Sequence, residues 1–98
     1  MTIESKMNGT ALEIALHGRL DAASSEQLKT MLNDALPGAD SLILDFADLD
    51  YVSSAGLRLL LSTHKTMNGK GGMKVINVNE IMREVLGVTG LADVLTIE

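Results

Sequence analysis

Two adjacent serines, Ser53 and Ser54, stand between an acidic stretch and an amphipathic stretch that begins at Ala55. A serine at the start of a helix lies where unpaired backbone N–H groups point outward and where the helix dipole is positive. That place favours an anionic group such as a phosphate. The pair could therefore present a hydroxyl for reversible phosphorylation, whereas the simpler interpretation is that one of the serines only caps the helix.

Three carboxylates precede the serines and suggest a second chemistry. Asp45, Asp48 and Asp50 offer the oxygen ligands that Mg²⁺ prefers, although such a group more often forms a solvated acidic loop. The two histidines, His17 and His64, fall in different elements and do not form a zinc-binding spacing. We therefore expect no metal and no other cofactor.

The composition limits the class of protein. The 98 residues suffice for one domain, expected to span 1–98, and 46% of them are apolar. The lack of cysteine excludes disulfides and thiol catalysis and fits a reducing compartment, so we expect a cytoplasmic protein. A net charge of −5 argues against nucleic acids and anionic membranes as partners. No signal peptide and no apolar run of membrane-spanning length is evident.

Hydrophobic periodicity predicts an alternation of strands and helices. Strands are expected over 2–7, 10–17, 41–46, 73–78 and 94–97. A helix is expected to begin near Ser24, where Ser24 and Gln27 match a capping box, with Asp21 as the other candidate cap. It should end at Pro37-Gly38, and further helices are expected over 55–68 and from Asn79 to about Leu86, with Gly87 as the stop.

The order of these elements predicts an α/β fold. Alternation after the opening hairpin indicates a mostly parallel sheet with crossover helices. The apolar run 41–46 predicts a central strand covered on both faces. The helix residues expected to pack against the sheet are Leu28, Met31, Leu57 and Leu60.

The segment around the serines resembles the signature of the STAS domain (sulphate transporter and anti-sigma factor antagonist). The resemblance rests on Leu44-Asp45, Leu49 and Tyr51-Val52-Ser53-Ser54-Ala55-Gly56-Leu57. Gly18-Arg19-Leu20-Asp21 resembles the Gly-x-Leu-Asp motif after the family's second strand, and Gly87-Val88-Thr89-Gly90-Leu91 resembles its last-helix region. It implies a STAS-like mixed, mostly parallel sheet of four or five strands with helices packed on it.

The resemblance also implies a function. Short members without membrane segments look like bacterial anti-sigma factor antagonists, which are not enzymes and which regulate transcription by partner switching. The unmodified antagonist binds an anti-sigma factor that is also a serine kinase. Phosphorylation by that kinase releases the antagonist, and a serine phosphatase resets it.

The family's common acceptor pattern is Asp-Ser-Ser/Thr-Gly-Leu, with the first serine modified. Laid on this chain, the Asp falls on Ser53, the acceptor on Ser54 and the following Ser/Thr on Ala55. Ser54 is therefore the expected phosphorylation site, with Ser53 as the alternative. The residues that the resemblance assigns to partner binding are Asp21, Asp48, Asp50, Ser53, Ala55, Gly56 and Arg58.

Two other functions stay open at this point. One is a non-phosphorylated STAS subunit of a transporter-associated or larger signalling complex. The other is a small serine hydrolase using Ser54, against which speaks only the lack of a Gly-x-Ser-x-Gly elbow and of a recognisable triad.

Overall fold

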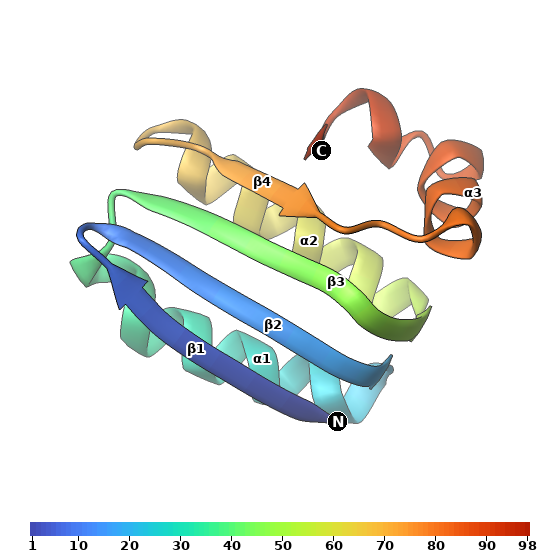
Figure 1. Ribbon diagram of the computed structural model, residues 1–98, viewed down its shortest axis with the longest axis horizontal. Helices are drawn as coiled ribbons and strands as arrows, with labels where there is room; N and C mark the ends of the chain where they lie inside the picture. The colour runs from blue at the N-terminus through green and yellow to red at the C-terminus, as the bar shows by residue number, and fades with distance from the viewer.

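Five strands form one mixed sheet in the order β1-β2-β3-β4-β5 in the computed structural model, which describes residues 1–98. β1 is antiparallel to β2, and the other neighbouring pairs are parallel. The strands are β1 (Thr2–Asn8), β2 (Ala11–Leu20), β3 (Ser41–Val52), β4 (Met73–Ile76) and β5 (Thr96–Ile97). The helices are α1 (Ala22–Ala35), α2 (Ser54–Asn68) and α3 (Glu80–Val88), with 3₁₀ turns at Leu36–Gly38 and Leu91–Asp93. This architecture confirms the predicted fold class (Figure 1).

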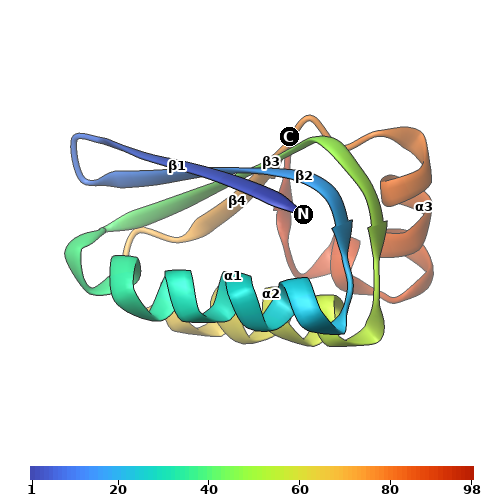
Figure 2. The same ribbon diagram turned by 90° about the horizontal axis from the view of Figure 1, so that it is seen from below.

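The two long helices lie side by side on one face of the sheet (Figure 2). Alternate residues of the central strands point into this layer, because side chains of a strand alternate between its faces. Leu28 of α1 and Leu60 of α2 are fully buried there, as predicted. Leu57 and Met31 are both half-buried, and of these two Leu57 is the one that packs against the same core. The strand residues of this layer are Leu12, Ile14, Leu16, Leu42, Leu44, Phe46, Met73 and Val75.

The other face of the sheet is open. Ile43 and Asp45 alternate with the buried residues of β3 and are only half-buried. The prediction that 41–46 is covered on both faces is therefore wrong. Both long helices cross on the same side of the sheet, and the opposite side of β3 carries a carboxylate that a doubly covered strand would exclude.

β2 and β3 run further than predicted, to Leu20 and Val52, because bulges bend them without ending them. The pairing register between them shifts twice, each time with an extra residue in β3. Buried positions of β3 consequently fall three residues apart, at Phe46, Leu49 and Val52. The acidic stretch predicted as a loop is thus the bent second half of a strand.

Of the two candidate caps of α1, Asp21 is confirmed, whereas the predicted stop of α3 at Gly87 is wrong. Asp21 is the N-cap of α1, and its carboxylate accepts a hydrogen bond from the Ser24 backbone N–H at 2.9 Å. Ser24 occupies the third helical position and returns the bond by accepting from the Asp21 N–H at 2.9 Å. At the other end of the chain, α3 passes through Gly87, because the left-handed residue that terminates it is Gly90, with φ of 81°.

Leu60 tests the packing of α2 on the sheet. We expect Leu60→Ala to lower the free energy of unfolding by about 2–5 kcal/mol, because the truncation leaves a cavity in the core. Ile81→Ala on α3 is the control, since Ile81 is 66% exposed and its loss should change stability by no more than about 0.5 kcal/mol. Urea unfolding measures both, and a similar loss in the two variants would contradict the assigned packing.

Candidate phosphorylation and partner-binding site

The candidate site lies at the edge of the sheet where parallel strands end. β2 ends next to Asp21, β3 ends next to Ser53, and a helix begins directly after each of them (Figure 1). Hydrogen bonds tie these junctions together. The Ser53 N–H donates to the Leu20 carbonyl at 2.8 Å, and the Asn79 side chain donates to the Leu49 carbonyl at 3.2 Å. Ligands and partners of open α/β sheets commonly bind at this edge.

Ser53 is the N-cap of α2. It has extended backbone angles, and its hydroxyl accepts a hydrogen bond from the Gly56 N–H at 3.2 Å. Its carbonyl accepts the first helical bond, from the Leu57 N–H at 2.9 Å. Of the two serines, Ser53 is therefore the capping residue and is half-buried in that role.

Ser54 is the first residue of α2 and is exposed. Its hydroxyl is not needed for the cap, because Ser53 makes that bond. The structure thus assigns the cap to Ser53 and leaves the Ser54 hydroxyl free. The side chain at the positive end of the helix that is both free and accessible is that of Ser54.

Gly56 sets how closely α2 approaches the strands. It is buried, and a Cβ added to it would lie 2.9 Å from Val52 Cγ1 and 3.0 Å from Leu20 Cδ2. The missing side chain is therefore explained by tight helix–strand packing, and Gly56 would affect a partner through its placement of the helix start. Ala55 is half-buried, whereas Arg58, one turn further along, is exposed.

Asp21 is committed to the cap of α1. Hydrogen bonds from the backbone and the hydroxyl of Ser24 lower the pKa of its carboxyl, and Arg19 acts in the same direction. Arg19 itself lies over the ring of Tyr51, with 4.1 Å from the guanidinium carbon to the ring centroid. This cation–π pair joins β2 to β3 beside the site.

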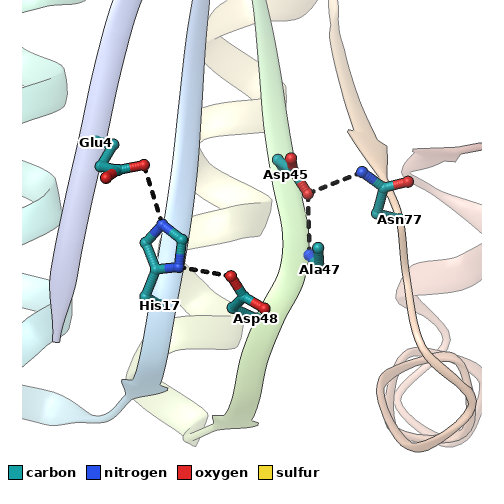
Figure 3. A network of polar contacts seen from close by, with 6 residues as sticks. All are labelled: Glu4, His17, Asp45, Ala47, Asp48 and Asn77. Atoms are coloured by element: carbon teal, nitrogen blue, oxygen red, sulfur yellow. Dashed lines mark hydrogen bonds and ion pairs between the residues drawn. The ribbon is translucent and has the colours of Figure 1, made fainter.

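A second polar group lies on the open face of the sheet (Figure 3). The His17 ring nitrogens bond to carboxylates on both sides, at 2.8 Å from Asp48 and 3.2 Å from Glu4. The bond to Glu4, then that to Asp48, raises the pKa of His17, while partial burial acts in the opposite direction. Asp48 thus points toward His17 and not toward the serines.

The other two acidic residues of β3 are separated from Asp48. Asp45 accepts from the Ala47 N–H at 2.9 Å and from the Asn77 side chain at 3.0 Å. Asp50 is exposed. No group of three or more His, Cys, Asp or Glu side chains comes together to hold a metal ion.

The sequence did not point to His17, Arg19 or Tyr51 as neighbours of the site. No pattern in the sequence pairs His17 with a carboxylate, because its partner Asp48 is 31 residues away in the chain. The Arg19–Tyr51 pair is likewise formed only by strand pairing. In the sequence these residues appear only as polar residues near the ends of β2 and β3. They become informative once the pairing register of the two strands is known.

Gly56 and Gly87 form a matched pair for testing the close approach of α2. We expect Gly56→Ala to lower the free energy of unfolding by about 1–3 kcal/mol, because the methyl group would collide with Val52 and Leu20. Gly87 also lies in a helix but has nothing within 4 Å of an added Cβ. Gly87→Ala should therefore stabilise by about 0.5–1 kcal/mol, and a gain in both variants would contradict the packing role of Gly56.

An NMR titration of the His17 ring tests the network on the open face. We expect a pKa above the ordinary value of about 6.5, lowered by Glu4→Gln and by Asp48→Asn but unchanged by Glu26→Gln on α1. Because the folded-state pKa is raised, the bridge stabilises the protein below about pH 6.5 and loses this contribution as pH rises through the folded-state pKa. An unchanged titration in both carboxylate variants would contradict the bridge.

Known proteins resemble the chain over nearly its whole length. A family profile described as "Mlab, STAS domain" matches residues 3–96. The chain is 28% identical over 100 residues to the anti-sigma F factor antagonist of Paenibacillus polymyxa, with 99% of this chain and 86% of that protein covered. It is 26% identical over 98 residues to the anti-sigma-B factor antagonist of Bacillus subtilis (strain 168), with 99% and 90% covered.

The fold is also similar to that of a solved protein. The solved structure of the anti-sigma factor antagonist SpoIIAA in its unphosphorylated form matches with a TM-score of 0.84 at 22% identity, covering 99% of this chain and 88% of that one. No helix of the chain combines the length and the apolar character required to cross a membrane. With its mixed five-stranded sheet and a family match over 3–96, the chain belongs to the STAS domain family.

Proposed function

We propose that this chain is an anti-sigma factor antagonist whose binding is controlled by phosphorylation of Ser54. The proposal rests on one observation at the start of α2. Ser53 caps the helix, and Ser54 has an exposed hydroxyl that makes no hydrogen bond within the chain. Its relatives named as anti-sigma factor antagonists support the same function. The proposed partners are an anti-sigma factor with serine kinase activity and a serine phosphatase.

The proposed switch follows from charge. The kinase transfers the γ-phosphoryl group of ATP to Ser54 Oγ, the bond to the ADP oxygen breaks, and the hydroxyl proton leaves to a base or to solvent. The phosphate adds a charge of about −1.5 to −2. The helix start accommodates this charge, but a partner that covers Ser54 must strip its water, at a cost of several kcal/mol if it stays unpaired.

The proposed contact surface surrounds Ser54 at the carboxyl edge of the sheet. Exposed Asp50 and Arg58, with half-buried Ala55, offer charged groups and a shallow contact next to the hydroxyl. Asp21 and Asp48 contribute negative charge while they hold α1 and His17 in place. A partner that sets basic side chains against these carboxylates and an acidic group against Arg58 fits those charges.

Ser53 stands where the family's acceptor pattern has Asp. Both residues are good N-caps, because each offers a side-chain oxygen to a backbone N–H of the first turn. The replacement therefore keeps the cap but removes a negative charge next to the acceptor. This single difference is the feature that favours the second candidate, a STAS subunit that binds its partner without being phosphorylated.

A hydrolase is poorly supported by the geometry. Both ring nitrogens of His17 bond to carboxylates, and His64 lies about 15 Å further along α2 than Ser54. Neither histidine is therefore in a position to take the proton from the Ser54 hydroxyl.

Stability and phosphorylation of two serine variants test the proposal together. Ser53→Ala should lose about 0.5–2 kcal/mol of stability as the cap is removed, whereas Ser54→Ala should stay within about 0.5 kcal/mol of wild type. With a kinase partner co-purified from the native cells and labelled ATP, Ser54→Ala should bind but take up no phosphate, and Ser53→Ala should still be labelled. Labelling lost only in Ser53→Ala would move the acceptor to Ser53.

A charged variant tests the release step. Ser54→Asp should fold normally, because the helix start favours an anion, and should bind the partner more weakly than wild type. Thr66→Asp, at an exposed position in the last turn of the same helix, is the control for added charge. Equal binding by Ser54→Asp and wild type would show that charge at Ser54 is not the release signal, and the non-phosphorylated subunit would then be the better assignment.

A further inference from the structure

A hollow of about 270 Å³ separates the first turns of α1 and α2. Its walls include Ser25, Glu26 and Lys29 from α1 and Ala55 and Arg58 from α2. It opens beside the candidate phosphorylation site, because Ala55 follows Ser54 directly. Two of its charged side chains are cations, and neither takes part in any ion pair of the structure.

Ser25 has an unsatisfied hydroxyl in this hollow. The residue is 5% exposed, and its Oγ is buried without a hydrogen-bond partner. A buried hydroxyl without a partner is costly, so it is a group that a bound polar ligand would satisfy. In the first turn of α2, the Ser53 hydroxyl and carbonyl accept from the Gly56 and Leu57 N–H groups, and the Ala55 N–H stays unpaired.

Arg58 lies four residues after Ser54 on the same helix. Side chains at this spacing are neighbours on the helix surface, about 5–6 Å apart at Cβ. Both side chains are exposed and unengaged. A guanidinium presents several N–H donors to a phosphate and is therefore a strong partner for one.

We infer that a phosphate on Ser54 is bound within the chain by Arg58, at the mouth of the hollow, where the Ala55 N–H and the hydroxyls of Ser25 and Ser62 are further donors. The inference rests on the proposed function, since it concerns the phosphorylated form of Ser54. Lys29 adds positive charge to the same hollow, and Glu26 is the acidic side chain that must turn away from the phosphate.

This pairing changes how the switch works. In the unmodified protein Arg58 is an exposed cation next to Ser54, available to an acidic group of the partner. In the phosphorylated protein the same guanidinium is occupied by the phosphate. One modification would then add negative charge to the contact surface and withdraw its nearest positive charge.

The test uses the full chain with phosphoserine placed at 54 during translation, so that no kinase is needed. ³¹P NMR gives the second pKa of the phosphate, ordinarily about 6. We expect Arg58→Gln to raise this pKa by at least about 0.3 units, because the dianion loses its partner, and Arg58→Lys to restore part of the shift. Lys65→Gln removes the same charge from the last turn of α2 and should leave the pKa unchanged.

Each outcome decides the inference. A larger rise of the phosphate pKa in Arg58→Gln than in Lys65→Gln supports the pairing. A rise in Ser25→Ala that is smaller than the rise in Arg58→Gln supports a contribution of the hollow to phosphate binding. Equal shifts in Arg58→Gln and Lys65→Gln, or none in either, would overturn it. The proposed function fails separately, if the partner kinase does not label Ser54 in the otherwise unmodified chain.

Discussion

The site depends on one close contact, where α2 crosses the ends of β2 and β3 at Gly56. The Cβ that Gly56 lacks would stand 2.9 Å from Val52, and the Ser53 N–H is bonded to the Leu20 carbonyl at 2.8 Å. These contacts fix the end of one strand against the end of its neighbour. Because α1 starts next to Leu20 and α2 next to Val52, they also fix both helix starts, and with them the hollow and Ser54.

The bulges in β3 help to place the end of this strand next to the start of α2. Each extra residue bends the strand toward the helix layer, so that Leu49 and Val52 stay buried although the period of two is lost. At the first bulge, the Asp45 carboxylate accepts a hydrogen bond from the Ala47 N–H. A straight strand would carry its last residues past the helices, and Ser53 could not bond to Leu20.

The sequence predicts the order of elements and the family, but not the details that shape the site. Leu12, Ile14 and Leu16 show a period of two and Leu28, Leu32 and Ala35 a helical period, so both kinds of element are recognisable. The second half of β3 is not, because its bulges replace that period. Asp21 and Ser24 satisfy each other reciprocally, so either resembles a cap from sequence alone. The His17–Asp48 bond depends on register, which local patterns do not encode.

The neutral cap at Ser53 affects how much the charge of the first turn of α2 would change when Ser54 is phosphorylated. An aspartate there would hold a permanent negative charge on the first turn of α2, and a phosphate on Ser54 would be a second anion beside it. With serine, the first turn of α2 has no acidic side chain in the resting protein. A phosphate on Ser54 would then be the first anion of this turn, whereas with aspartate it would be the second. The relative change in the charge of the turn on modification is therefore larger with serine.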